Sequence, residues 1–485
     1  MGFPIRASPI GSASSSRDVK RFSKEEPAVR KALTAAASSL KFAFLPRRTR
    51  GQERADRGLG ELIIKVIPKQ AFPPPGETSI IDSGIPGSVR KLTALPGKRN
   101  HVLMSQLPTT GRSAARPTGY LKQLDAVRTI AVAMVIATHW LPSATTFWFN
   151  GGFGVKIFFV ISGFLITGIL LDARNKAEKS GFQRTGVLKR FYARRFLRIF
   201  PLFYATLALT FLLGVPTVRG YIWWLIAYLG NVLIALRGGW LDGIAHFWSL
   251  AVEEQFYFVW PILMLFTPRR LLLPLITSAI VFAPLFRLAL FLQGINEITV
   301  GVLPFASLDT LGLGAMLAFL WQQGDGEAGG RARTVLCVVS IAGCMGFFVL
   351  HIANWLRGVP AYCSWIMTVT DALTAFGAVW LTARGLRGPL GWLMNWAPLV
   401  YLGRVSYGLY ILHPFMPDMV VRVFRLLRLP SVASLGPIFL LGLNLTALIA
   451  VCSLSWHFFE KKINDLKRFF PYVSPTAVHV DKVTI

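Results

Sequence analysis

Hydrophobic and polar positions alternate along this chain in whole segments rather than residue by residue, from about residue 119 to residue 465. Each apolar segment approaches or exceeds the ~18 residues that a helix needs to span a bilayer, and short polar loops separate the segments. No repeat with a period of 20 to 50 residues is visible, so a solenoid is not suggested. We therefore predict an all-α polytopic membrane protein.

The number of crossings depends on one short apolar segment, residues 221–236, which contains Gly230 and Asn231. If it crosses fully, the basic loop around Arg269 falls outside; if it is re-entrant or interfacial, that loop falls inside. We prefer the second alternative, because cytoplasmic loops are rich in Lys and Arg. About ten transmembrane helices are then expected, near residues 124–139, 151–165, 196–213, 248–266, 271–292, 302–321, 335–352, 365–381, 399–420 and 435–458.

The orientation follows from the basic loop between the second and third spans, residues 174–195, which is predicted to be cytoplasmic. The N-terminal arm and the C-terminal tail then also face the cytoplasm. Arg128 and His139 stand 11 residues apart, about 16 Å along a helix, so we expect Arg128 near the inner face and His139 near the outer one. One exception weakens the register of the last two spans: three arginines, Arg422, Arg425 and Arg428, would be external.

The chain divides into three parts. Residues 1–118 hold no apolar run long enough to span and are predicted to be a disordered basic extension, residues 119–465 a membrane domain, and residues 466–485 a short cytoplasmic tail. Met104 opens a polar lead into the first span, which raises the hypothesis that the working protein lacks residues 1–103. Mass spectrometry that finds native peptides before Met104 would remove it.

Composition narrows the function classes. The hydrophobic set makes up 53% of the residues and charged residues only 15%, where a soluble protein has about 25% charged residues. The net charge of +29 does not indicate a nucleic-acid binder: residues 1–103 carry 19 Lys/Arg against 8 Asp/Glu, or +11, and most of the remainder flanks apolar spans. The four cysteines form no CxxC pair, so neither a zinc site nor a disulfide framework is predicted.

His139 is the first candidate for chemistry, because imidazole can accept a proton from an attacking hydroxyl near neutral pH. The structural alternative is an interfacial histidine beside Trp140.

Asp125 and Arg128 share a helix face at i, i+3. The alternative to a functional role for these two residues is a structural ion pair. Ionisable residues inside spans cost roughly 3 kcal/mol and tend to be functional. Glu253 and Glu254 are the second such case. We favour Glu253 as a partner of His139, with Glu254 close behind; the alternative is that Glu254 and Trp248 are interfacial anchors.

An arginine cluster lies at the predicted inner edge of the third span. Arg194, Arg195 and Arg198 form an RRxxR spacing near Arg190, and Arg128 is expected at the same face. Guanidinium groups offer paired donors to phosphates. The alternative is that these arginines only enforce topology by snorkelling.

Five blocks of residues resemble the acyltransferase-3 family of integral membrane acyltransferases, in the family's order and over roughly residues 119–465. The blocks are Asp125/Arg128/His139, Gly151 to Leu165, Arg194 to Arg198, His246 to Tyr257 and Gly403 to Tyr410. The resemblance implies acyl transfer, usually acetyl from acetyl-CoA, to a hydroxyl of a sugar-containing acceptor. It also implies that His139 is the motif histidine and that the RRxxR residues bind acyl-CoA. Many family members carry an acidic residue at the position of Lys156, which points to a different acceptor or acyl group here.

The function predicted is a membrane-embedded O-acyltransferase of the cell (plasma or inner) membrane, in which His139 deprotonates a hydroxyl of a carbohydrate or glycolipid acceptor that attacks acyl-CoA directly. Acyl-CoA is expected as a donor substrate; no permanently bound cofactor, metal or nucleic acid is expected. The alternatives are a proton-coupled transporter, which also needs intramembrane His, Glu and Arg, and a non-catalytic scaffold. Further substrate-contacting or structural residues are expected at Asp125, Gly152, Ser162, Trp248, Ser249, Ser406 and Tyr407. Tyr410 and His413 are expected to line the substrate cavity together with Ser406 and Tyr407.

Overall fold

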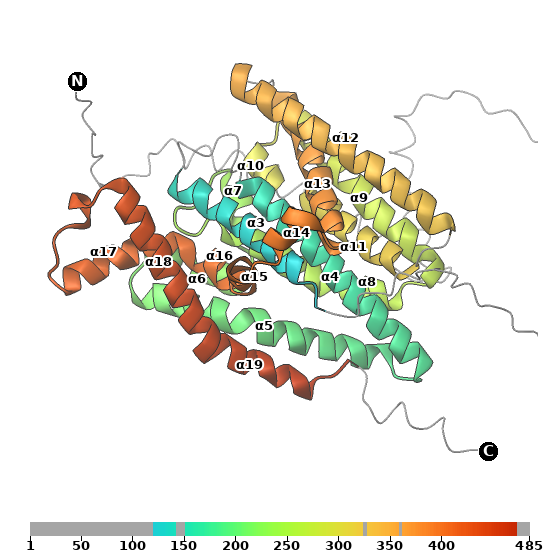
Figure 1. The fold of residues 1–485 in the computed structure, drawn as a ribbon, viewed down its shortest axis with the longest axis horizontal. Coiled ribbons are helices and arrows are strands. Elements are labelled where there is room, and N and C mark those ends of the chain that lie inside the picture. Colours follow the sequence, from blue (N-terminus) through green and yellow to red (C-terminus); the bar gives the residue numbers. More distant parts are fainter. Residues whose placement is uncertain (1–119, 142–150, 324–326, 358–360, 473–485) are drawn as a thin grey trace, which may run out of the picture. The chain divides into compact units, whose positions relative to one another are not determined.

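The computed structural model describes residues 120–141, 151–323, 327–357 and 361–472. The predicted extension, residues 1–118, and the end of the predicted tail lie outside this part of the chain. Within the described ranges every regular element is helical and none is a strand, which confirms the all-α prediction (Figure 1). The longer helices are α3 (Lys122–Trp140), α4 (Gly151–Lys179), α5 (Arg184–Leu212), α8 (Phe247–Phe266), α9 (Arg269–Leu292), α11 (Leu308–Gln323), α12 (Glu327–Arg357), α13 (Ala361–Ala383) and α18 (Pro437–Ser455).

Shorter elements connect these helices and close the ends of the bundle. They are α6 (Pro216–Ile226), α7 (Gly230–Arg237), α10 (Glu297–Gly301), α14 (Gly388–Met394), α15 (Ala397–Arg404), α16 (Ser406–Leu412), α17 (Met416–Leu426), α19 (Lys461–Asp465), 3₁₀ turns at Pro304–Ser307, His413–Phe415, Val432–Ser434 and Leu466–Phe469, and a π turn at Trp456–Glu460.

Seven described helices are long and apolar enough to cross a membrane, or eight if the bent pair α6 and α7 counts as one span. The expected count of about ten is therefore not confirmed by the described helices. Helices α3 and α8 are not among the seven, because each carries the ionisable residues singled out in the sequence and these lower its mean hydropathy. The axes of α6 and α7 differ by 116°, which fits either a re-entrant segment or a broken span.

The expected span near residues 399–420 is not one helix. It is divided into α15, α16, the turn His413–Phe415 and α17. Pro414 lies in this turn, where its ring removes a backbone donor and stops a regular helix from continuing. The break separates a largely buried α16 from α17, which is exposed over much of its length.

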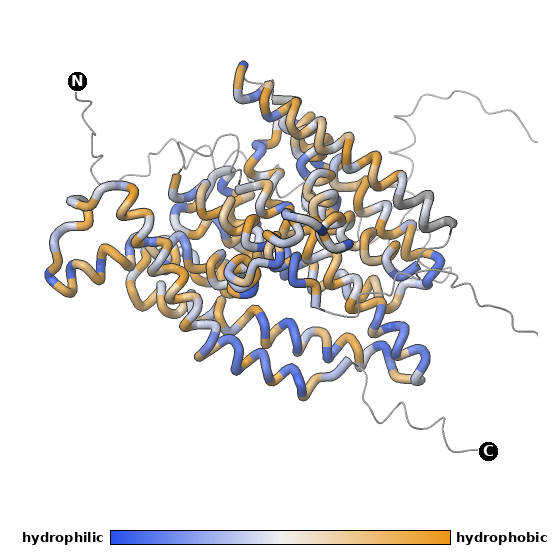
Figure 2. Tube along the Cα trace, in the orientation of Figure 1, coloured by the Kyte–Doolittle hydropathy of each residue, from blue (hydrophilic) through white to orange (hydrophobic). Residues whose placement is uncertain are grey.

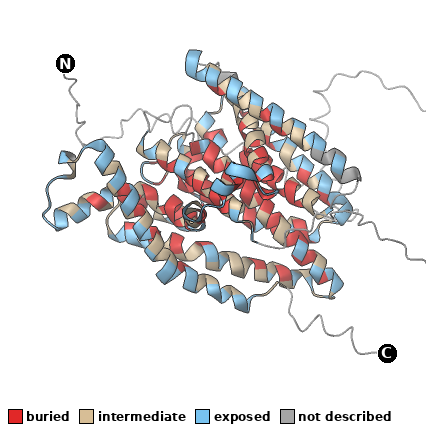
Figure 3. Cartoon of the chain, viewed as in Figure 1, coloured by how far each residue is buried: buried red, intermediate tan, exposed pale blue. Residues whose placement is uncertain are grey.

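Helix α4 is the centre of the bundle. In its apolar window 67% of the residues are buried, against 11% for α12, which leaves most of α12 exposed at the periphery (Figure 3). Close approach depends on glycine: a Cβ on Gly163 would lie 2.0 Å from the carbonyl oxygen of Leu311, and one on Gly314 would lie 2.1 Å from that of Val160. Helices α4 and α11 thus contact backbone to backbone, as small residues in a membrane helix permit.

The C-terminal helices pack on α5. Helix α19 contacts α5, and the hydropathy-coloured trace shows hydrophilic residues along both (Figure 2). Arg194 on α5 donates to the carbonyl oxygens of Lys467 (2.9 Å) and Phe470 (3.2 Å) at the end of the chain described. These bonds join α5 to carbonyls at the end of the C-terminal helical segment, where a helix leaves backbone acceptors available.

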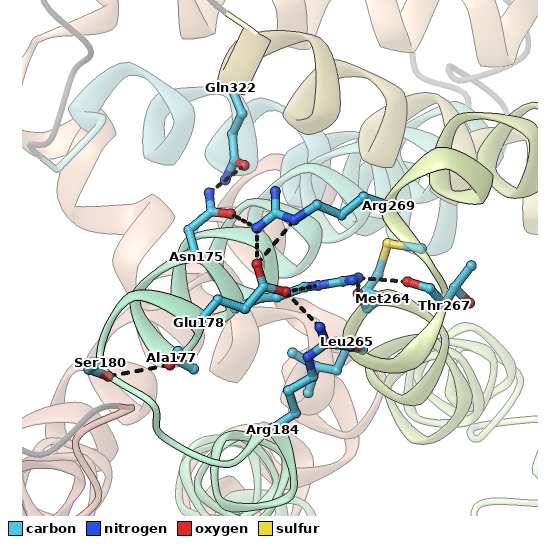
Figure 4. A network of polar contacts seen from close by, with 11 residues as sticks. Asn175, Ala177, Glu178, Ser180, Arg184, Met264, Leu265, Thr267, Arg269 and Gln322 are labelled. Carbon is cyan, nitrogen blue, oxygen red and sulfur yellow. Dashed lines mark hydrogen bonds and ion pairs between the residues drawn. The ribbon is translucent and has the colours of Figure 1, made fainter. Parts of the chain in front are cut away.

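A polar network around the carboxylate of Glu178, near the end of α4, joins α4 to α5, α8 and α9 (Figure 4). Glu178 accepts hydrogen bonds from Arg174, Arg184 and Arg269, at distances of 2.5 to 2.9 Å. Arg174 is buried and also donates to the carbonyl oxygens of Met264 and Thr267, both at 2.8 Å, at the C-terminal end of α8. This Glu178 network fixes the start of α5, and so the position of the arginines that follow along that helix.

Candidate active site

Two cavities lie against α4 and have different chemistry. The first, which we call the arginine cavity, has a volume of about 100 Å³. That is below the ~300 Å³ of an ordinary ligand pocket, so it suits a slender chain rather than a whole ligand. Its polar lining residues are Arg128, Ser162, Arg195, Arg198, Ser249, Glu253, Glu254, Tyr257, Ser406, Tyr407 and Tyr410.

The second cavity, which we call the histidine cavity, has a volume of about 640 Å³, within the range of ligand-binding pockets. Its lining combines aromatic rings with a few polar and charged groups. The residues used below are His139, Gly152, Lys156, Trp240, His246, Trp248, Arg287, Phe291, Glu297, Ser364 and Trp365.

Three residues line both cavities: Val155, Phe159 and Tyr410. They form a thin shared wall. The hydroxyl of Tyr410 lies 2.5 Å from Oγ of Ser249 and donates to the backbone carbonyl of His246 at 3.0 Å. The wall is therefore built from α4 on one side and from the broken segment after α15 on the other.

His139 lies at the C-terminal end of α3 and is exposed to the histidine cavity. Its Nδ1 lies 2.8 Å from the backbone oxygen of Val135 and 3.4 Å from Nε2 of His413. A carbonyl oxygen only accepts hydrogen bonds, so Nδ1 carries the proton in the neutral ring. Nε2 then holds the lone pair that a general base requires.

Glu253 lies in the arginine cavity, not beside His139. Ser162 donates to its Oε1 at 2.5 Å, and Tyr257 donates to the Oγ of Ser162 at 2.8 Å. His246, not Glu253, lines the histidine cavity together with His139, and Glu253 stands seven residues further along the chain, about 10 Å along a helix. In the described part of the chain the two residues line different cavities and share no hydrogen bond, so a direct contact between His139 and Glu253, as expected of partners, is not present. Glu254 also lines the arginine cavity.

The structure separates the predicted arginine cluster. Arg195 and Arg198 line the arginine cavity together with Arg128, whose Nη1 donates to Oδ1 of Asp125 at 2.8 Å. Arg194 does not line it, because its guanidinium turns to the C-terminal carbonyls and stacks on Tyr472. The RRxxR spacing predicted that the three arginines lie together at one end of the helix. It could not show that Arg194 instead bonds to the C-terminal segment, which is far away in the sequence.

The remaining predicted residues divide between the cavities. Gly152 and Trp248 line the histidine cavity, and Ser162, Ser249, Ser406 and Tyr407 line the arginine cavity. The hydroxyl of Tyr407 donates to the backbone oxygen of Ile199 at 2.7 Å, which ties α16 to α5. Asp125 lies outside the lining, and Gly403 packs directly against its backbone: a Cβ there would lie 1.8 Å from the Asp125 oxygen.

Two ion pairs next to the histidine cavity were not predicted from the sequence. Lys156 lies 2.5 Å from Oδ2 of Asp371, and Arg287 lies 2.6 Å from Oδ2 of Asp309. Each cation lines the cavity while its carboxylate lies behind it. The signal available was the presence of ionisable residues within apolar segments, but their pairing joins helices distant in sequence.

Comparison with known proteins gives a family match. The acyltransferase-3 family, whose model is described as an acyltransferase domain, matches residues 121–457. Similar proteins include the O-acetyltransferase OatA of Staphylococcus aureus strain NCTC 8325, 28% identical over 368 residues that cover 71% of this chain and 57% of the relative. The putative O-acetyltransferase SACOL0978 of S. aureus strain COL is 26% identical over 399 residues, or 73% of this chain and 58% of the relative. The chain thus spans under two thirds of these relatives' lengths, and no solved structure matches it.

Proposed function

This chain belongs to the acyltransferase-3 family. From that premise we propose that it transfers an acyl group, acetyl in the first instance, from acyl-CoA to a hydroxyl of a carbohydrate or glycolipid of the cell envelope. The observation that carries the proposal is the contact of the two cavities at Val155, Phe159 and Tyr410. A phosphate-binding group of arginines borders one cavity, and a histidine with an available lone pair borders the other.

Acyl-CoA suits the arginine cavity in both charge and shape. Arg128, Arg195 and Arg198 line it and offer donors to the CoA phosphates. The cavity is narrow, which fits the pantetheine arm, and that arm is about as long as half of a ~30 Å hydrocarbon core. A thioester carried on it would reach the shared wall from the side of the arginines.

His139 is the proposed general base. Its Nε2 takes the proton of the acceptor hydroxyl while the acceptor oxygen attacks the thioester carbonyl. The carbon–sulfur bond then breaks, and the CoA thiolate leaves and takes a proton from the imidazolium or from water. The products are the acyl ester and free CoA. A positioned base supplies about 10²- to 10⁴-fold in rate. Orientation of the two substrates where the two cavities adjoin adds to this rate enhancement.

The histidine cavity suits a sugar as acceptor. Aromatic rings of Trp240, Trp248, Trp365 and Phe291 can pack against the apolar face of a sugar ring, while polar groups among them bind its hydroxyls. Lys156 and Arg287 are each neutralised by a buried aspartate. Among the described residues that line the histidine cavity, Glu297 is the one carboxylate. Because the two cations are paired and this carboxylate would repel an anion, the cavity favours an uncharged acceptor over an anionic one.

For the setting of the enzyme we propose the cell membrane, with both termini on the cytoplasmic side. The arginine cavity then opens toward the cytoplasmic supply of acyl-CoA, and the histidine cavity faces the envelope. The basic loop 174–195 and the Lys/Arg of the tail support this orientation.

The alternative is a proton-coupled transporter of a small polar solute. The bent pair α6 and α7 and the divided segment from α15 to α17 support it, because carriers use broken helices at their binding sites. The experiment that separates the two supplies radiolabelled acetyl-CoA to the purified protein in liposomes with a panel of envelope glycans. Labelled glycan supports the enzyme; solute uptake without labelled glycan supports the carrier.

A further inference from the structure

A second histidine, His413, is buried directly behind His139. Its side chain is fully buried, with an exposed fraction of 0%, at the turn between α16 and α17. The centroids of the two imidazole rings lie 4.9 Å apart in an edge-to-face arrangement. Ionisable side chains are costly to bury in a membrane protein, so a fully buried histidine at this place calls for a role.

The hydrogen bonds of His413 determine where its lone pair lies. Its Nδ1 is 2.7 Å from the backbone oxygen of Tyr410, and that oxygen can only accept. Nδ1 of His413 is therefore the protonated nitrogen of the neutral ring. Nε2 is left as an acceptor, 3.4 Å from Nδ1 of His139.

The same reasoning extends to His139. Its Nδ1–H is directed to two acceptors, the oxygen of Val135 and Nε2 of His413. A further bond joins the two segments that carry these histidines: Nε1 of Trp140, the residue after His139, donates to the carbonyl oxygen of His413 at 3.2 Å. The ring of His139 is thus held with Nε2 away from His413.

We propose that His413 is the positioning residue of His139: it accepts the Nδ1–H bond, holds Nε2 as the base, and stabilises the imidazolium that forms when His139 takes the acceptor proton. On protonation of His139 the Nδ1–H···Nε2 bond becomes charge-assisted and stronger. This inference rests on the proposed function. His413 acts through His139 and does not touch the reacting atoms.

Two conservative substitutions separate positioning from a merely structural role. Asparagine places its amide where Nδ1 of histidine lies, so His413→Asn keeps the bond to Tyr410 but cannot reach His139. Glutamine places its amide oxygen near the position of Nε2, so His413→Gln keeps an acceptor for His139. Loss of a hydrogen bond to a charged group corresponds to roughly 10- to 100-fold in rate.

The test measures acyl transfer by the purified full chain in liposomes, with acetyl-CoA and the best acceptor of the panel. We expect kcat to fall roughly 10- to 100-fold in His413→Asn and clearly less in His413→Gln, with the KM for acetyl-CoA unchanged in both. His457→Gln is the matched control, because His457 makes a similar 2.9 Å contact to a backbone carbonyl but is exposed on another helix. An equal kcat in the wild type and His413→Asn, or a lower kcat in His413→Gln than in His413→Asn, would overturn the proposal.

A second measurement separates this inference from the proposed function. Nitrogen-15 NMR of histidine-labelled protein, with His139 assigned by its substitution, reports which ring nitrogen carries the proton. We expect the Nδ1–H form for His139 in the wild type. An Nε2–H form would overturn the inference even if transfer occurs, whereas absence of transfer with an Nδ1–H form would overturn the proposed function alone.

Discussion

Ser162 donates a 2.5 Å hydrogen bond to Glu253, and Tyr257 donates to Ser162 in turn. This chain of three side chains joins α4 to α8 at the arginine cavity. The carboxylate therefore belongs to the proposed path of the donor, and its effect on transfer should be separate from that of the base.

Substitutions at Glu253 and His139 should act independently. Because the two residues lie in different cavities and share no partner, the losses of kcat/KM in Glu253→Gln and His139→Gln should add in the double variant to within about 0.5 kcal/mol. Kinetics of the two single variants and the double variant measure this. A double variant no worse than His139→Gln alone would mean that the two residues act as one unit, contrary to the geometry.

The arginines of α5 should differ in their effect on the donor. Arg195→Ala and Arg198→Ala should each raise the KM for acetyl-CoA roughly tenfold, because each removes a charged donor from the arginine cavity. Higher ionic strength should weaken donor binding in the wild type. Arg194→Ala is the matched control and should change this KM little, since Arg194 bonds to the C-terminal carbonyls. A KM that rises most in Arg194→Ala would contradict the assignment.

The contact of α4 with α11 should not tolerate a methyl group. Gly163→Ala should lower the thermal unfolding temperature of the protein in detergent, because its Cβ would overlap the Leu311 oxygen and overpacking costs about 1–3 kcal/mol. Gly168→Ala on the same helix is the control: there the nearest atom to a new Cβ is 3.9 Å away, at Ala318. Equal unfolding temperatures for the two variants would show that the helices do not meet as described.

Membrane orientation can be measured with single cysteines in a chain whose native cysteines are replaced. A cysteine at Lys179, beside the Glu178 network, should resist an impermeant thiol reagent in intact cells, because the loop is expected to be cytoplasmic. A cysteine at the exposed Asp242, which precedes the opposite end of α8, should react. Labelling at Lys179 but not at Asp242 would reverse the proposed orientation.

Much of the fold and part of the site could be predicted from the sequence. Apolar segment lengths predicted the long helices, and most of the residues singled out in the sequence, among them Ser162, Glu253 and Tyr407, line the two cavities against α4. The division of residues 399–420 was missed because Pro414 alone does not show whether a span kinks or breaks. The partner of His139 was also missed: His413 lies 274 positions away in the sequence, and only the break after α16 brings it there.

The measurement that tests the central claim most directly is acyl transfer by His139→Ala together with its binding of CoA. We predict that transfer falls by roughly 10²-fold or more, the usual scale for a lost general base. CoA should raise the unfolding temperature of this variant as much as that of the wild type, because Arg128, Arg195 and Arg198, the proposed phosphate-binding residues, line the other cavity. Full transfer without His139, or loss of CoA binding in this variant, would contradict the account and favour the transporter.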